Sequence, residues 1–221
     1  MDRPSHDYAD ARNMMVDSQV RPNKVYDSRL IAAMRRLPRE RFVPPQAAAR
    51  AYADEDVPLG NGRVLTEPMV IARLIELAAL RHGERVLVVG SGTGYAAAVL
   101  AACGAVVTAL EEDESLIAMA RTTLAGIAGI AQVSGPLAEG WPAAAPYDLV
   151  LIDGAADVVP AAIIGQIRTP GGRLIGILAG AGRLGRAVVG EPVAGGLSFQ
   201  PAFDCATPLL PALRRPPAFV F

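Results

Sequence analysis

Three glycines stand at every second position, Gly90, Gly92 and Gly94, directly after the apolar run Val86–Val89. Because glycine has no Cβ, a ligand can lie against the main chain there, and positive φ angles are allowed. Glu111 ends the next apolar run, about 20 residues after the first glycine, where a carboxylate can accept hydrogen bonds from both hydroxyls of a ribose. Alone, the glycines could form a tight turn and Glu111 could begin an acidic loop. Together they favour a site for a nucleoside-bearing ligand.

The spacing of the glycines narrows the class of ligand. A dinucleotide-binding turn needs Gly-x-Gly-x-x-Gly, and Tyr95 stands at the sixth position here. A phosphate-binding P-loop needs Gly-Lys-Ser/Thr, which this segment does not contain. The tighter Gly-x-Gly-x-Gly spacing is similar to that of S-adenosylmethionine-dependent methyltransferases.

The elements that must hold these residues alternate between strands and helices. Apolar runs predict strands at 86–89, 106–110, 131–134, 149–152 and 173–178. Helical spacing of apolar residues predicts helices at 95–103, 115–124 and 160–167. This alternation predicts an α/β fold with a parallel sheet covered on both faces, and a ligand site at the carboxyl ends of its strands.

The first third of the chain is predicted to be helical and to shape the ligand cleft. Apolar periodicity predicts helices at 8–20, 28–37, 46–52 and 68–80, with Asp27 as the cap of the second. The stretch at 54–68, rich in Gly, Pro and acids, is predicted to be a loop. From about Arg183 onward we expect strands interrupted by Gly and Pro. We expect one domain with three parts: N-terminal helices and acceptor loop at 1–80, a cofactor-binding sheet core at 81–180, and C-terminal strands at 181–221.

Composition argues against several classes of function. The net charge of −1, with 19% charged residues and no basic face, argues against binding to nucleic acid. We expect neither a signal peptide nor a membrane span, and therefore a cytoplasmic protein. Cys103 and Cys205 are expected to be free, buried thiols. No Ser-His-Asp set or metal-ligand cluster is visible in the sequence, and His6 and His82 are given no role.

Longer stretches resemble the protein-L-isoaspartate O-methyltransferase family. The matching segments lie between residues 14 and 178 and include MMVDSQVRP, LIAAMRRLPRERFVP, AYADEDVPLGNGRVLTEP, ERVLVVGSGTGYAAAVLA, VTALEED, GPLAEGWPAAAPYDLVLIDGAA and IRTPGGRLI. The resemblance implies a Rossmann-like class I S-adenosylmethionine-dependent methyltransferase fold: a mostly parallel seven-stranded sheet, helices on both faces and an N-terminal helical extension. It also implies S-adenosyl-L-methionine as cofactor. The implied acceptor is the carboxylate of an L-isoaspartyl residue in a damaged protein or peptide.

The resemblance places two binding sites on particular residues. It implies cofactor contacts at Val88, Gly90, Ser91, Gly92, Gly94, Glu111, Glu112, Pro136 and Leu137. It implies acceptor contacts at Gly62, Thr66, Glu67, Asp153 and Gly154, with Thr66 in the position of the family's active-site serine. An isoaspartyl carboxylate, with a reference pKa of about 4, is already ionised at neutral pH and needs no general base. Catalysis can then come from alignment of the reactants and exclusion of water.

Several residues depart from the family's pattern. The acceptor loop reads GRVLTEP where the family typically reads GQTISQP. Thr66 keeps a hydroxyl that could orient the acceptor, although it could instead only cap the following helix. Val88 and Pro136 stand where the family usually has acids near the cofactor, which favours weaker cofactor binding. Glu67 and Asp153 could repel an acceptor carboxylate or take up a proton, unless Asp153 turns outward or caps the next loop.

These departures leave two other functions open. Asp153 or Glu67 could serve a methyltransferase of the same fold that acts on a different acceptor, as a base for a hydroxyl or as a partner for an amine. Val88 and Pro136 could mark a non-catalytic relative that keeps the fold and binds the cofactor weakly.

Overall fold

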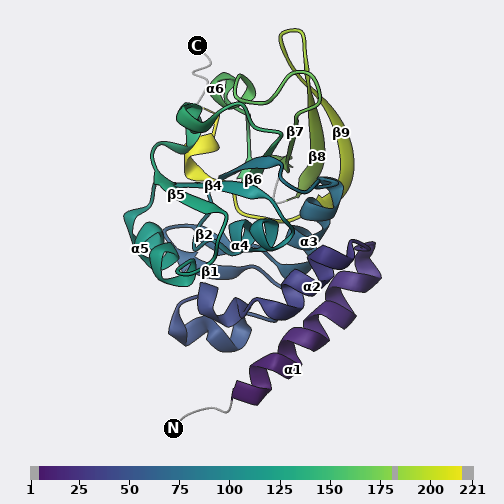
Figure 1. Ribbon diagram of the computed structural model, residues 1–221, viewed down its shortest axis with the longest axis vertical. Helices are drawn as coiled ribbons and strands as arrows, with labels where there is room; N and C mark the ends of the chain where they lie inside the picture. Colours follow the sequence, from purple (N-terminus) through teal and green to yellow (C-terminus); the bar gives the residue numbers. More distant parts are fainter. Residues whose placement is uncertain (1–4, 181–183, 216–221) are drawn as a thin grey trace.

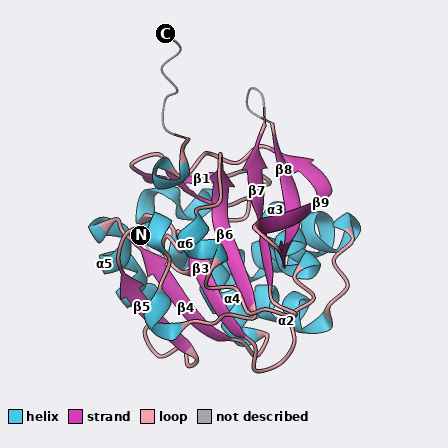
Figure 2. Cartoon of the chain, turned by 90° about the horizontal axis from the view of Figure 1, so that it is seen from above, coloured by secondary structure: helices cyan, strands magenta, loops and turns pink. Residues whose placement is uncertain are grey.

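A seven-stranded sheet forms the centre of the computed structural model, which describes residues 5–180 and 184–215. The strand order is β5-β4-β3-β6-β7-β8-β9, and Figure 2 shows the strands fanning across the molecule in this order. The strands are β3 (Arg85–Val89), β4 (Val106–Glu111), β5 (Ile130–Ser134), β6 (Leu149–Ala156), β7 (Arg173–Ala179), β8 (Gly185–Val193) and β9 (Gly196–Cys205). The first five pair in parallel, and β8 and β9 add antiparallel strands at one edge.

The helices cover both faces of this sheet. They are α1 (Ser5–Met15), α2 (Ser28–Arg36), α3 (Pro68–Leu77), α4 (Tyr95–Ala102), α5 (Glu114–Thr123) and α6 (Ala161–Ile164). Successive strand residues point to opposite faces. Val86 and Val88 accordingly lie in one buried core, and Leu87 and Val89 lie in a second core on the other face. Figure 1 shows α1, in purple, at the side of the molecule next to α2. Burial on both faces explains why these strands are continuous apolar runs.

Four predicted elements differ from the structure. The predicted helix at 46–52 is a 3-10 helix at Pro45–Arg50, the predicted helix at 160–167 is shortened to α6, and α3 ends at Leu77 instead of residue 80. The predicted loop at 54–68 contains a two-stranded hairpin, β1 (Val57–Gly60) and β2 (Arg63–Leu65). The hairpin forms because Gly60, Asn61 and Gly62 all adopt positive φ, which turns the chain tightly enough for the strands to pair.

Other predictions agree with the structure. Asp27 is the N-cap of α2, and its carboxylate accepts a hydrogen bond from the main-chain N–H of Arg29 over 2.8 Å. The region of 8–20 is helical throughout, as α1 followed by a turn of π-helix at Val16–Val20. Both cysteines are free and buried. The side chain of His6, which was given no role, lies outside those that the structure describes.

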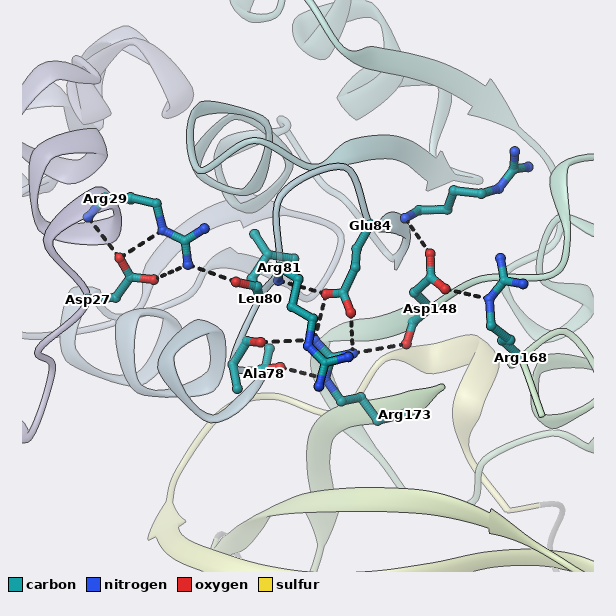
Figure 3. Close-up of polar contacts among 11 residues, drawn as sticks. Asp27, Arg29, Ala78, Leu80, Arg81, Glu84, Asp148, Arg168 and Arg173 are labelled. Atoms are coloured by element: carbon teal, nitrogen blue, oxygen red, sulfur yellow. Dashed lines mark hydrogen bonds and ion pairs between the residues drawn. The ribbon is translucent and has the colours of Figure 1, made fainter. Parts of the chain in front are cut away.

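Ion pairs join the loops at the amino end of the sheet. Figure 3 shows Arg173 between the carboxylate of Glu84 and the carbonyl of Ala78, and Asp148 facing Arg168. These contacts link the starts of β3, β6 and β7 to the segment that follows α3. Within residues 5–180 and 184–215, none of the helices combines the length and the apolar character needed to cross a membrane.

Candidate active site

The order of the strands creates a crevice between β3 and β6. From β3 the chain runs outward through β4 and β5, and then returns to β6 on the opposite side of β3. Connections that leave neighbouring strands in opposite directions open a crevice at their carboxyl ends, which is where open α/β sheets bind ligands. β3 ends just before Gly90, and β6 extends through Asp153 and Gly154 to Ala156. Both predicted sites therefore meet at this crevice.

The turn after β3 has the conformation that its glycines suggested. Gly90, Gly92 and Gly94 have φ angles of 75°, 56° and 94°, in the left-handed region where an L side chain is strained. The N–H groups of Gly90 and Ser91 both donate to the carbonyl of Leu110, each over 3.0 Å. The N–H of Gly94 donates to the carbonyl of Ser91 over 2.8 Å. These bonds hold the turn rigidly between the ends of β3 and β4.

Glu111, at the end of β4, has a carboxylate whose oxygens are all engaged. The side chain is fully buried and forms a bidentate ion pair with Arg63, whose Nη1 and Nη2 donate to Oε1 and Oε2 over 2.7 and 3.0 Å. The main-chain N–H groups of Gly92, Glu112 and Asp113 donate to the same carboxylate. A carboxylate has about four lone-pair sites, and five donors already use them.

Arg63 is a site residue to which the sequence analysis gave no role. It lies on β2 and is only 7% exposed. Besides its pair with Glu111, its Nη2 donates to the carbonyl of Gly90 over 2.8 Å. The available signal was the arginine at a position where the family pattern has glutamine. Because the partner lies 48 residues away in the sequence, that signal could not show where the guanidinium binds.

Thr66 and Asp153 form the polar pair on the acceptor side of the crevice. The hydroxyl of Thr66 donates to Oδ1 of Asp153 over 2.9 Å. The N-cap residue of α3 is Glu67, without a side-chain capping bond, so the interpretation of Thr66 as a helix cap is wrong. The interpretation of Asp153 as an outward residue is also wrong. A bulge between Leu151 and Ala155 lets β6 continue past residue 152 and directs the Asp153 carboxylate inward.

The environment of Asp153 makes its carboxyl easier to protonate than usual. Burial raises the pKa of this carboxyl to about 6, and the hydrogen bond from Thr66 and the charges of Arg63 and Arg39 only partly oppose the rise. Burial also raises the pKa of Asp56, whose carboxylate accepts the N–H of Glu67 over 2.8 Å. The pKa of Glu67 is raised by burial and by neighbouring acids. This side of the crevice therefore holds carboxyls that take up protons more readily than usual.

Arg39 positions the acceptor loop and was also missed by the sequence analysis. Its side chain is fully buried, and its Nη2 donates to the main-chain carbonyl of Thr66 over 2.6 Å. Its Nε donates to the carbonyl of Ala51, and its guanidinium lies 4.7 Å from the ring centroid of Tyr95, the first residue of α4. One cation therefore ties Thr66 to the helix that follows the glycine turn. Its place in the segment PRERFVP, which matches the family, was the available signal.

The remaining predicted cofactor residues lie around the turn. Val88 is fully buried within β3, and Ser91 is buried with a hydroxyl that has no hydrogen-bond partner among the described residues. Glu112 accepts the N–H of Leu137 through Oε2 over 3.1 Å. Pro136, which has no N–H, precedes this contact, and Leu137 is fully buried. Thus the segment expected near the adenine contributes an apolar side chain to the core and no acid.

The predicted acceptor residues are only partly brought together. Thr66, Glu67, Asp153 and Gly154 lie at the crevice, whereas Gly62 is exposed at the tip of the β1–β2 hairpin. A cavity of about 500 Å³ opens at the carboxyl ends of β6 and β7. Its lining includes Asp56, Ala155, Asp157, Thr207, Pro208 and Leu209. Because Asp56 contacts Glu67, this cavity adjoins the acceptor loop.

Comparison with known proteins identifies the family. The family model described as protein-L-isoaspartate(D-aspartate) O-methyltransferase matches residues 10–180. The chain belongs to this family. Two protein-L-isoaspartate O-methyltransferases are similar to it. That of Methylorubrum extorquens is 42% identical over 78% of this chain and 75% of the relative. That of Methylorubrum populi is 44% identical over 75% of this chain and 78% of the relative.

Solved structures agree with the fold of a protein-L-isoaspartate O-methyltransferase. One such structure covers 92% of this chain and 67% of its own, with a TM-score of 0.79 and 23% identity. Another, from Plasmodium falciparum in complex with S-adenosyl-L-homocysteine, covers 91% of this chain and 98% of its own, with a TM-score of 0.75 and 16% identity. The comparisons confirm the family resemblance, the predicted fold class and the prediction of an S-adenosylmethionine-dependent methyltransferase.

Proposed function

We propose that this chain transfers a methyl group from S-adenosylmethionine to the carboxylate of L-isoaspartyl residues, at the crevice between β3 and β6. The observation that supports the proposal is that the predicted cofactor and acceptor residues lie together at one edge of the sheet, in a chain of this family. The glycine turn, the Glu111 carboxylate and the Thr66–Asp153 pair all lie at the carboxyl ends of adjacent strands. When bound, S-adenosylmethionine supplies an electrophilic methyl group for an in-line displacement.

The residues of the turn suit the cofactor chemically. Glu111 ends β4 in the position of a ribose-binding carboxylate, and the buried, unpartnered hydroxyl of Ser91 supplies a polar group. Glycine at residues 90 and 92 leaves the main chain accessible to a ligand once neighbouring side chains move. The donor and acceptor groups therefore fit the cofactor, although Arg63 must release Glu111 before a ribose can use it.

Thr66 and Asp153 would bind and orient the acceptor. An incoming carboxylate raises the pKa of Asp153 further, because a second negative charge disfavours ionisation. With its pKa already about 6, Asp153 then holds a proton and can donate a hydrogen bond to the acceptor. The Thr66 hydroxyl is then free to donate to the same carboxylate. The acceptor oxygen attacks as it is, without a general base, and the peptide occupies the adjoining cavity lined by Asp56 and Thr207.

A second candidate is a methyltransferase of this family with a different acceptor. The observation that favours it is the group of three carboxyls, Asp56, Glu67 and Asp153, around the acceptor loop. When ionised, they would repel a carboxylate and attract an amine. The protonation of Asp153 on carboxylate binding removes part of this conflict, which is why we favour the isoaspartyl acceptor.

Two measurements test the proposed function. Calorimetric titration with S-adenosylhomocysteine should show heat of binding, and its absence would contradict the cofactor. Transfer of a labelled methyl group should occur to an isoaspartyl peptide and not to the matched aspartyl peptide. Cofactor binding without transfer to the isoaspartyl peptide would favour the second candidate.

A further inference from the structure

The C-terminal segment Thr207–Leu213 runs along the end of β6, and Figure 1 shows it as a yellow coil among teal and green elements. The N–H of Ala155 donates to the carbonyl of Pro208 over 3.1 Å, and the N–H of Leu210 donates back to Ala155 over 2.8 Å. Farther along, the N–H of Asp157 donates to the carbonyl of Leu213 over 3.0 Å. The segment is thus bonded to the strand that forms one side of the crevice.

The side chain of Leu210 lies against the two glycines that border the crevice. Leu210 is 3% exposed. Its atoms approach to 3.0 Å of the position that a Cβ would take at Gly90, and to 2.7 Å of that position at Gly154. Nη2 of Arg63 stands 3.2 Å from the same position at Gly90. In this conformation, the space left open by the missing side chain of Gly90 is therefore filled by residues of this chain.

The polar half of the predicted cofactor site is covered in the same way. Arg63 occupies both carboxylate oxygens of Glu111 and the carbonyl of Gly90. A ribose can take the place of the guanidinium only by breaking this bidentate pair, since the other donors to Glu111 are the main-chain N–H groups of Gly92 in the turn and of Glu112 and Asp113 after β4. Leu210 and Arg63 meet at Gly90. Leu210 covers the glycine with an apolar side chain, and Arg63 covers the polar groups beside it.

We infer that Leu210 and Arg63 form an intramolecular plug that competes with S-adenosylmethionine, so that cofactor binding is coupled to release of the segment Thr207–Leu213. This inference rests on the proposed function for the identity of the ligand. In the closed state, which the structure shows, the plug is held in place by contacts within this chain. The apparent dissociation constant of the cofactor is then its intrinsic value divided by the fraction of molecules in which the plug is open.

Calorimetry with S-adenosylhomocysteine on the full chain tests whether the plug lowers the affinity for the cofactor. Leu210→Ala removes side-chain contacts that exist only in the closed state, so it should tighten binding by about tenfold. Arg63→Gln, which removes the ion pair, should also tighten it. Leu174→Ala is the matched control, because Leu174 is equally buried in the same core but lies on β7, which pairs with β6 and β8 and not with β3. Its affinity should equal that of the unmodified chain.

Amide hydrogen exchange on the unmodified chain tests the structural part and does not depend on a variant that folds. Saturation with S-adenosylhomocysteine should speed exchange at the N–H groups of Leu210 and Asp157, whose acceptors belong to the β6–tail contact. The N–H of Leu87, inside β3, serves as the reference for global effects.

The outcomes separate this inference from the proposed function. Equal affinities in all four proteins, with Leu210 and Asp157 amides as protected as before, would overturn the plug and leave the proposed function intact. Absence of binding in every protein, including Leu210→Ala and Arg63→Gln, would overturn both. Tighter binding in those two variants together with faster tail exchange would establish the plug.

Discussion

The two ends of the central sheet use the same kind of ion pair at different degrees of exposure to water. At the amino end, Arg173 pairs with Glu84, their side chains 16% and 11% exposed, and Arg168 pairs with Asp148, 44% and 20% exposed (Figure 3). At the carboxyl end, Arg63 and Glu111 are 7% and 0% exposed.

The difference shows what each end contributes. A pair that keeps contact with water gains little and loses little when one partner leaves. A buried pair has no solvent to replace a missing partner, so it is stable only while both groups, or a substitute ligand, are present. The amino end therefore joins loops, whereas the carboxyl end holds a carboxylate whose partner can be exchanged.

Removal of Glu111 should have the largest effect. Glu111→Ala leaves the Arg63 guanidinium buried beside main-chain N–H groups that lose their acceptor, so the free energy of unfolding should fall by about 3–5 kcal/mol. Urea denaturation followed by circular dichroism measures this change. The double variant Arg63→Gln/Glu111→Gln should recover much of the loss, because no charge remains unpaired. A loss below about 1 kcal/mol would show that water reaches the pair and would remove the contrast between the two ends.

Thr66 should be the next most sensitive position, and its effect should appear in activity. Thr66→Val removes the hydroxyl that donates to Asp153 while keeping the shape of the side chain. Loss of a hydrogen bond to a charged group should lower kcat/KM for an isoaspartyl peptide by about 10- to 100-fold. Thr66→Ser, which keeps the hydroxyl, should retain most activity. Equal rates for the two variants would exclude a role for the hydroxyl in orienting the acceptor.

Arg173 tests the amino end. Arg173→Ala breaks its bonds to Glu84 and to the carbonyl of Ala78, and should lower the free energy of unfolding by about 1–2 kcal/mol, clearly less than Glu111→Ala. Affinity for S-adenosylhomocysteine should not change, because Arg173 begins β7 at the opposite end of the sheet. A change in that affinity would show that the two ends are coupled through the strands.

The pH dependence of acceptor binding should be the smallest effect. Below about pH 6 the Asp153 carboxyl is neutral and can donate to an acceptor carboxylate, and above that pH it is anionic and repels it. KM for an isoaspartyl peptide should therefore rise by a few-fold as the pH increases from 6 to 8, by less than the tenfold per unit of one fully coupled proton. Steady-state kinetics across this range measure the slope. Asp153→Asn should flatten it, and a slope that persists in this variant would assign the titration to another group.

The parts of the site that the sequence predicted are local in the chain. The glycine turn follows its strand directly, and Glu111 ends the next strand, so apolar runs and glycine spacing were enough to place them. The missed parts depend on contacts between distant segments. Arg63 reaches Glu111 across 48 residues, and Leu210 reaches Gly90 from the end of the chain. Periodicity carries no information about such contacts.

Two errors of prediction have the same origin. The hairpin at Val57–Leu65 looked like a loop because its strands are short and its turn residues dominate the composition. Asp153 looked like a residue beyond a strand end because a bulge, which no local pattern announces, carries β6 past it. In both cases, pairing with a neighbouring strand decided the conformation.

The segment Thr207–Leu213 has two sides with different neighbours. Leu210 faces the glycine turn, while Thr207, Pro208 and Leu209 line the cavity beside the acceptor loop. A single stretch of backbone thus borders both the glycine turn and the cavity, and a movement that uncovers the turn also changes the lining of the cavity. Linkage makes such an influence mutual. If a peptide in the cavity changes the affinity for a nucleoside at the glycine turn by some factor, the nucleoside changes the affinity for the peptide by the same factor.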